Sequence, residues 1–100
     1  MESFKDIIGQ ETLTLVDFFA TWCQPCKMMH PVLVQLKEQM GDKIRIVKVD
    51  IDKNADTANA YRIQSVPTLI LFQNGEIKWR QSGAISLPDL KSAILPFLGE

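Results

Sequence analysis

Hydrophobic residues fall into runs and repeats along this chain, and their spacing predicts an order of strands and helices. Residues 12–19 are apolar at nearly every position and rich in β-branched and aromatic side chains, which predicts a strand buried on both faces. From Met29 to Met40, apolar residues recur at the spacing of one helix face, and Gly41 marks the end of that helix. Pro31 is expected to kink the helix, because proline cannot donate a backbone hydrogen bond.

Three further strands are predicted after this helix. Residues 44–50 form a second apolar run, and a strand, a helix and a strand in this order imply a right-handed parallel unit. Residues 68–72 and 76–79 predict a hairpin, because Asn74 and Gly75 between them are typical of tight turns. The sheet should therefore have a parallel half and an antiparallel half.

Three more helices are predicted from capping residues and spacing. The Ser3–Asp6 pattern is a capping box that opens a short helix ending at Gly9. Another short helix is expected over residues 54–61. The Ser86–Asp89 pattern opens the last helix. Apolar residues follow the helical spacing there: Leu87, Leu90, Ile94 and Phe97.

These elements predict an α/β fold, with helices on both faces of a mixed sheet. One hundred residues suit one domain, which we expect to span residues 1–100. The composition, 46% hydrophobic and 23% charged, is that of an ordinary globular protein. Eleven basic and twelve acidic residues give a net charge of -1, so we expect neither a nucleic-acid nor a membrane partner. No apolar run approaches the roughly 20 residues that span a bilayer.

The first residues lack a basic segment followed by an apolar stretch, which is the pattern of a secretory leader. We therefore expect a cytoplasmic protein. The alternative is a periplasmic or secreted protein from which a leader has been removed. Two cysteines are too few for a disulfide-rich secreted scaffold.

The two cysteines of the chain, Cys23 and Cys26, lie where the first buried run gives way to the helix. Two thiols at this spacing can close into a disulfide and open again, and a helix N-terminus favours negative charge on the first sulfur. Beside a strand–helix–strand pattern, this motif indicates redox chemistry. A structural zinc site needs four ligands, and only His30 joins the cysteines locally, so no metal is expected. Buried structural cysteines, a non-catalytic scaffold, and a metal or iron–sulfur cluster shared by two chains remain alternatives.

Two charged residues interrupt the predicted buried strands. Asp17 lies within the first strand, where aspartate is rarely buried without a partner. Lys48 lies within the adjacent strand and by itself could be an exposed lysine with an apolar stem. Burial should raise the pKa of Asp17, and Lys48 nearby should limit the rise. His30 is expected to be a partly exposed helix residue, and Trp22 to be exposed for contact rather than packed in the core.

Several motifs follow one another in a specific order: Val-Asp-Phe-Phe-Ala, Trp-Cys-Gln-Pro-Cys-Lys-Met, Pro31, Val-Pro-Thr at 66–68, Phe-Gln-Asn-Gly at 72–75, and Gly83. With them, the chain resembles the thioredoxin family from about residue 16 to 98. It departs from the family in Gln24, where glycine is usual, and in Phe19, where tryptophan is common. The family's first strand is expected to be missing, which leaves about four strands.

The resemblance implies thiol–disulfide exchange with protein disulfides. Cys23, nearer the helix N-terminus and expected to be the more exposed, would attack the target, and Cys26 would resolve the mixed disulfide. Asp17 would accept the proton from Cys26, and Lys48 would tune the pKa of Asp17. The chain itself would need no cofactor. Electrons would come from a flavin-containing, NADPH-dependent thioredoxin reductase, and the protein would be a monomer.

The resemblance also implies a shallow groove that binds target segments and a cis peptide bond before Pro67. An extended target could pair with the backbone at Val66, because Pro67 has no N–H. Gly83 would allow a close approach. The residues expected to contact targets are Trp22, Gln24, Pro25, Val66, Pro67 and Gly83.

Overall fold

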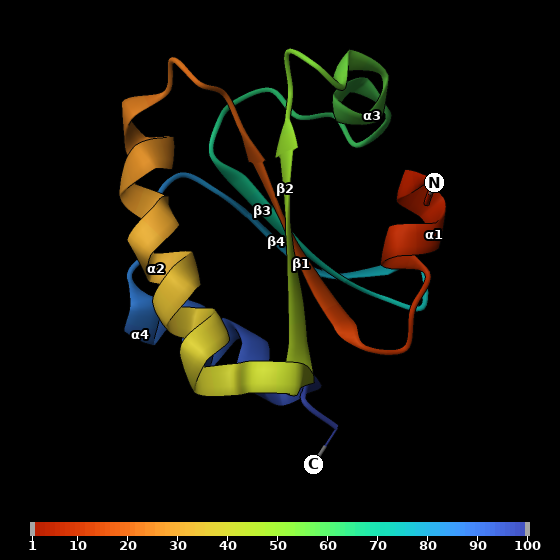
Figure 1. Cartoon of the computed structure of the whole chain (residues 1–100), viewed down its shortest axis with the longest axis vertical. Helices are drawn as coiled ribbons and strands as arrows, with labels where there is room; N and C mark the ends of the chain where they lie inside the picture. The colour runs from red at the N-terminus through yellow and green to blue at the C-terminus, as the bar shows by residue number, and fades with distance from the viewer. Residues whose placement is uncertain (1, 100) are drawn as a thin grey trace.

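A sheet with the strand order β2-β1-β3-β4 forms the centre of the computed structural model, which describes residues 2–99 (Figure 1). β1 (Leu13–Phe19) and β2 (Ile44–Asp50) pair in parallel. β3 (Thr68–Gln73) is antiparallel to β1 and to β4 (Glu76–Ser82). The mixed sheet of four strands, with a parallel half and a hairpin half, is therefore confirmed.

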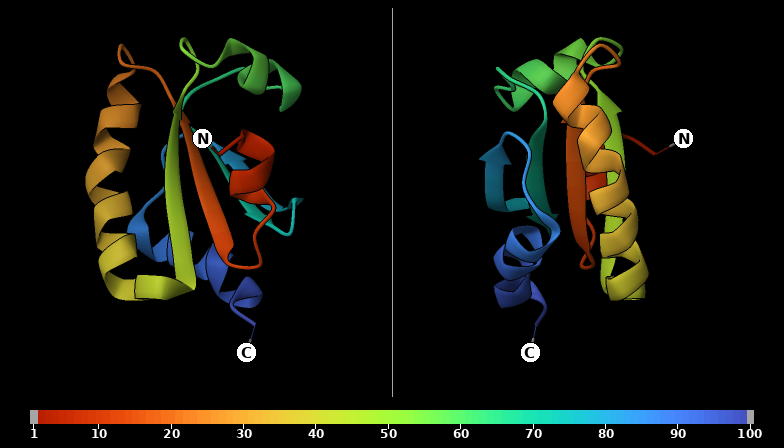
Figure 2. Two further views of the ribbon diagram at one scale, coloured as in Figure 1. Left: turned by 45° about the vertical axis from the view of Figure 1, so that its right-hand side comes forward. Right: turned by 90° about the vertical axis from the view of Figure 1, so that its left-hand side faces the viewer.

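Helices cover both faces of this sheet, as predicted. α1 (Phe4–Ile8) and α3 (Ala55–Ala60) lie on one face, and α2 (Gln24–Met40) and α4 (Leu87–Ile94) lie on the other (Figures 1 and 2). The parallel unit β1-α2-β2 places the start of α2 directly after β1. Short 3-10 turns follow two of the helices: η1 (Gly41–Lys43) after α2, and η2 (Leu95–Phe97) after α4.

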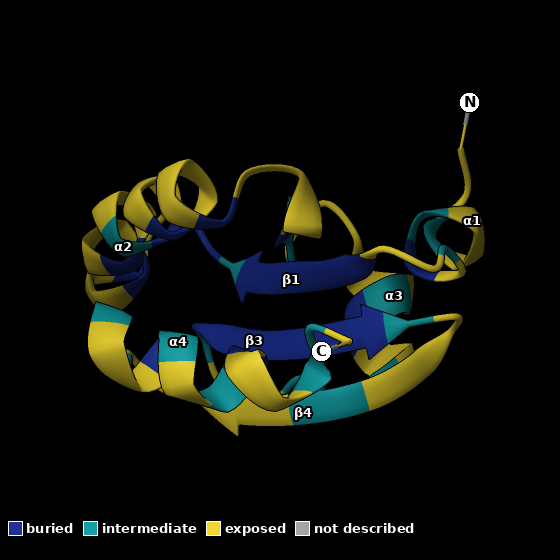
Figure 3. Ribbon diagram, turned by 90° about the horizontal axis from the view of Figure 1, so that it is seen from below, coloured by how far each residue is buried: buried dark blue, intermediate teal, exposed yellow. Residues whose placement is uncertain are grey.

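The two central strands are buried along nearly their whole length, whereas the edge strand β4 is largely exposed (Figure 3). Side chains alternate between the two faces of β1 and β3. Residues at odd positions pack beneath α2 and α4: Leu13, Leu15, Leu69 and Leu71. Residues at even positions pack with the core on the face of α1 and α3: Val16, Phe18, Ile70 and Phe72. Position 17 is odd, so this alternation directs it toward the α2 face.

Capping and periodicity locate the helices well. Ser3 Oγ accepts the Asp6 N–H at 3.2 Å, and Ser86 Oγ accepts the Asp89 N–H at the same distance. α2 runs without a break through Pro31, and the predicted stripe from Met29 to Met40 is its buried side. These contacts confirm the predicted helix starts and the predicted core face of α2.

Two element ends differ from the predictions by more than one residue. β4 continues to Ser82, three residues beyond the predicted end at position 79, because an exposed edge strand carries no apolar alternation there. The last α-helix ends at Ile94, and Phe97 lies instead in the turn η2. Pro96 explains this end, because it cannot donate to the carbonyl four residues earlier.

Candidate functional site

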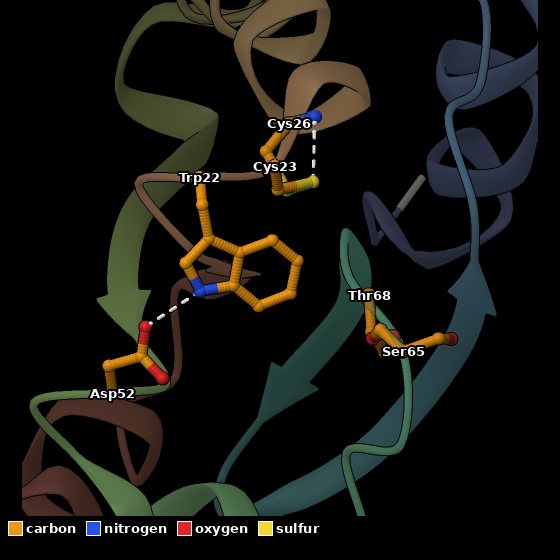
Figure 4. The surroundings of a disulfide bond; sticks show 6 residues. All are labelled: Trp22, Cys23, Cys26, Asp52, Ser65 and Thr68. Atoms are coloured by element: carbon orange, nitrogen blue, oxygen red, sulfur yellow. Dashed lines mark hydrogen bonds between the residues drawn. A yellow bond between two sulfur atoms is a disulfide. The ribbon is translucent and has the colours of Figure 1, made fainter.

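The two cysteines lie at the beginning of α2. Cys23 is the N-cap residue of the helix, Cys26 lies in its first turn, and a disulfide joins them with their Cα atoms 5.3 Å apart. The backbone N–H of Cys26 donates to Cys23 Sγ at 3.2 Å (Figure 4). The helix start therefore supplies the Cys23 sulfur with a hydrogen-bond donor and with the positive end of the helix dipole.

The expectation that Cys23 is more exposed than Cys26 is wrong for this disulfide form. Each residue is 4% exposed. The bond holds both in one small cluster with Ala20, against which Val66 and Ile51 pack. The two sulfurs differ instead in their place on the helix, since the first caps it and the second lies within it.

Trp22 is 68% exposed, which confirms its predicted exposure. Its indole Nε1–H donates to Asp52 Oδ2 at 3.0 Å, so the ring is held although solvent surrounds much of it (Figure 4). Asp52 belongs to the turn after β2, and its own N–H donates to Asp50 Oδ1 at 2.9 Å. Sequence reasoning missed Asp52, because nothing near position 52 marks a partner for a tryptophan thirty residues earlier.

Asp17 is fully buried, as predicted. Within residues 2–99, neither of its carboxylate oxygens has a hydrogen-bond partner. Burial raises the pKa of Asp17 to about 6, and the positive charge of Lys48 partly opposes this rise. The rise in the pKa of Asp17 that the sequence predicted is therefore confirmed.

Lys48 is the register partner of Asp17 across the β1–β2 pair. Its ammonium nevertheless lies 3.5 Å from His30 Nδ1 and 4.9 Å from the centre of the Phe19 ring. No ion pair joins it to Asp17 in the part of the chain that the structure describes. His30 is exposed, as expected, and its contact with Lys48 was not predicted.

The loop before β3 reaches the cysteine cluster. Val66 packs against that cluster, and the peptide bond between Val66 and Pro67 is cis, as the family resemblance implied. The Gly83 N–H donates to the Pro67 carbonyl at 2.8 Å. Gly83 has a φ of +93°, a conformation that side-chain-bearing residues rarely adopt. Gln24 and Pro25, at the start of α2, are both exposed.

Residues 2–99 contain neither a candidate metal site nor a candidate membrane span. No group of three or more His, Cys, Asp or Glu side chains there could hold a metal ion. None of the helices described is both long and apolar enough to cross a membrane.

The known proteins that this chain resembles are thioredoxins. A family model described as Thioredoxin matches residues 1–95. The chain is 51% identical over 67 residues to a thioredoxin of Bacillus subtilis (strain 168), covering 67% of this chain and 64% of that protein. It is 45% identical over 84 residues to a chloroplastic thioredoxin Y of Oryza sativa subsp. japonica, covering 83% of this chain and 50% of that protein.

A third relative matches over almost its whole length. Thioredoxin 1 of Chlorobaculum tepidum is 35% identical over 99 residues, which cover 98% of both chains. The chain therefore spans half to about two thirds of the first two relatives, and nearly all of this one.

Proposed function

Because this chain belongs to the thioredoxin family, we propose that it is a protein-disulfide reductase working by thiol–disulfide exchange through Cys23 and Cys26. The observation that carries the proposal is the disulfide at the N-terminus of α2, in which the Cys26 N–H donates to Cys23 Sγ. A donor held at this place favours a thiolate on Cys23 in the reduced protein, and the thiolate is the nucleophile of disulfide exchange.

The proposed reaction moves two electrons to the target. The Cys23 thiolate attacks one sulfur of the target disulfide, the target S–S bond breaks, and its second sulfur leaves as a thiolate. Cys26 then loses its proton and attacks the Cys23 sulfur of the mixed disulfide. The Cys23–Cys26 bond forms, the first target sulfur leaves as a thiolate, and the target is released reduced.

Asp17 is the proposed proton acceptor for Cys26. Its side chain is directed by strand alternation toward the face covered by α2, and its two oxygens are buried without partners among residues 2–99. With a pKa of about 6, the carboxyl group is mainly ionised at pH 7 and remains basic enough to take a proton. Lys48 has the proposed role of keeping that pKa from rising further.

Targets are proposed to bind across the surface formed by Trp22, the Val66–Pro67 turn and Gly83, with Gln24 and Pro25 beside it. Val66 lies against the cysteine cluster, so an extended target segment that pairs with its backbone would bring its disulfide toward Cys23. The exposed indole of Trp22, held by Asp52, offers a fixed apolar contact.

The protein acts as a monomeric domain of residues 1–100, in the cytoplasm, and is itself reduced by a flavin-containing, NADPH-dependent thioredoxin reductase. It needs no resident cofactor, since the electrons are stored in the two thiols.

Reduction of insulin disulfides, with dithiothreitol in excess to regenerate the protein, tests the function. The wild-type protein should accelerate reduction at catalytic concentration, and Cys23→Ser should lose the acceleration. Ser92→Ala, an exposed substitution on α4, is the control. Equal activity of wild type and Cys23→Ser would overturn the proposal.

A further inference from the structure

The edge strand β4 and the residue after it hold the loop of residues 61–67, which precedes β3. Arg80 makes two hydrogen bonds to this loop and Gly83 makes one, while Ser82 contacts Thr68 at the start of β3. Arg80 and Ser82 lie opposite Ile70 and Thr68 in the β3–β4 register, so their side chains share the face of the sheet that α1 and α3 cover. Gly83 follows directly after the strand. Arg80 and Gly83 contact the loop directly, and Ser82 contacts it through Thr68.

A pair of hydroxyl groups connects Ser82 to this loop. Thr68 Oγ1 lies 2.7 Å from the Ser65 carbonyl oxygen and 2.9 Å from Ser82 Oγ. A carbonyl can only accept, and the Thr68 hydroxyl has a single proton, so Thr68 donates to Ser65 and Ser82 donates to Thr68. Thr68 is fully buried, which makes this arrangement costly to disturb. Figure 4 shows Thr68 beside Ser65.

The carbonyl groups of Ser65 and Pro67, the residues on either side of Val66, therefore both accept a hydrogen bond. Thr68 binds the carbonyl of Ser65, and the Gly83 N–H binds the carbonyl of Pro67 at 2.8 Å. The Val66 side chain packs against the cysteine cluster. The backbone of Val66 is thus set between two fixed points, beside the cysteines.

The other end of the loop is held by Arg80. Its guanidinium donates to the carbonyl of Tyr61 and, at 2.9 Å, to the carbonyl of Arg62. Arg62 has a φ of +55°, which is uncommon for residues other than glycine. The planar guanidinium can hold both carbonyls at once, which a lysine could not do in the same geometry.

We infer that Thr68, Ser82 and Arg80 are positioning residues, which hold the Val66 backbone in the orientation that pairs with an extended protein target. This inference rests on the proposed function. A backbone ordered in advance loses less freedom when a target strand pairs with it, so these residues lower KM for protein disulfides. A small disulfide that reacts at Cys23 without pairing gains nothing from them.

The test compares two substrates for the same variants: insulin, and the small aromatic disulfide 5,5′-dithiobis(2-nitrobenzoate). Thr68→Val keeps the shape and removes the hydroxyl, and should raise KM for insulin about fivefold, the effect of losing one typical hydrogen bond. The rate with the small disulfide should stay the same. Thr68→Ser keeps the hydroxyl and should restore KM for insulin.

Two further variants address the other contacts. Ser82→Ala should raise KM for insulin in the same direction but less, since Thr68 keeps its bond to Ser65. Arg80→Met should also raise KM for insulin. Arg45→Met is the control and should leave KM unchanged, because Arg45 lies on β2 and pairs with Glu2.

Unchanged KM for insulin in Thr68→Val would overturn the inference, and so would an equal loss with both substrates, which indicates a general structural defect. If Thr68→Val does not fold, Ser82→Ala decides between the same outcomes. A wild-type protein that reduces neither substrate would refute the proposed function itself, and the inference would fall with it.

Discussion

Asp17 and Lys48 are register partners across the parallel strands β1 and β2, yet their charged groups do not meet. The ammonium of Lys48 lies over the Phe19 ring and beside His30 Nδ1, while the carboxylate of Asp17 stays buried without a hydrogen-bond partner among residues 2–99. Lys48 therefore acts on Asp17 through its charge rather than through a bond, and the pKa of the carboxyl remains raised.

Lys48→Met should raise the pKa of Asp17 above its value of about 6, because the substitution removes the charge that opposes the effect of burial. Carbon-detected NMR titration of the Asp17 carboxyl group measures this pKa directly. Lys43→Met, an exposed substitution in η1, should leave it unchanged. A lower pKa in Lys48→Met would contradict the assigned role of Lys48.

Asp17→Asn should stabilise the protein at pH 7 while slowing disulfide exchange. The carboxyl titrates near 6 in the folded protein and near 3.8 when unperturbed, so its favourable contribution is complete below about pH 3.8 and is lost as pH rises through 6. A shift of about two units corresponds to about 3 kcal/mol. Burying the asparagine amide offsets part of this stabilisation, so we expect the free energy of unfolding at pH 7 to rise by about 1–3 kcal/mol.

Urea unfolding at pH 4 and pH 7 measures this difference. Asp17→Asn should be no more stable than the wild type near pH 4 and should exceed it at pH 7, because only the wild type loses stability as Asp17 ionises between these pH values. Asp42→Asn, in the exposed turn η1, should show no such change. A variant that is less stable at pH 7 and reduces insulin at the normal rate would show that Asp17 has a structural role only.

The two cysteines should behave differently when targets are captured. Cys26→Ser should accumulate mixed disulfides through Cys23, because attack can occur but resolution cannot. Cys23→Ser should accumulate almost none. Non-reducing electrophoresis after incubation with a protein disulfide measures the trapped species, and equal trapping by both variants would refute the assignment.

Gly83→Ala should both destabilise the protein and weaken target binding. The φ of +93° strains any residue with a Cβ atom, at a cost of about 1–2 kcal/mol, although the space around that position is open. The same strain should displace the N–H that holds the Pro67 carbonyl, so KM for insulin should rise. Urea unfolding and insulin kinetics check the two effects; an alanine variant of normal stability would disprove the strain.

The sequence by itself determined the elements and their buried faces. The apolar stripe from Met29 to Met40 and the caps at Ser3 and Ser86 depend on residues a few positions apart, and such local patterns are readable along the chain. The same holds for the Cys23–Cys26 spacing at a helix start and for Asp17 as a charge inside an apolar run. The end of β4 was not readable, since an exposed edge has no periodic pattern.

Only the tertiary structure decided which distant side chains meet. Asp52 receives the Trp22 indole from thirty residues away, and Ser82 reaches Thr68 across fourteen, because turns and strand register bring them together. The Lys48 ammonium lies beside His30 rather than Asp17, because α2 packs against β2 and places the His30 ring next to it at the surface. None of these pairs leaves a local pattern, because a polar residue looks the same along the chain whether or not the fold supplies its partner.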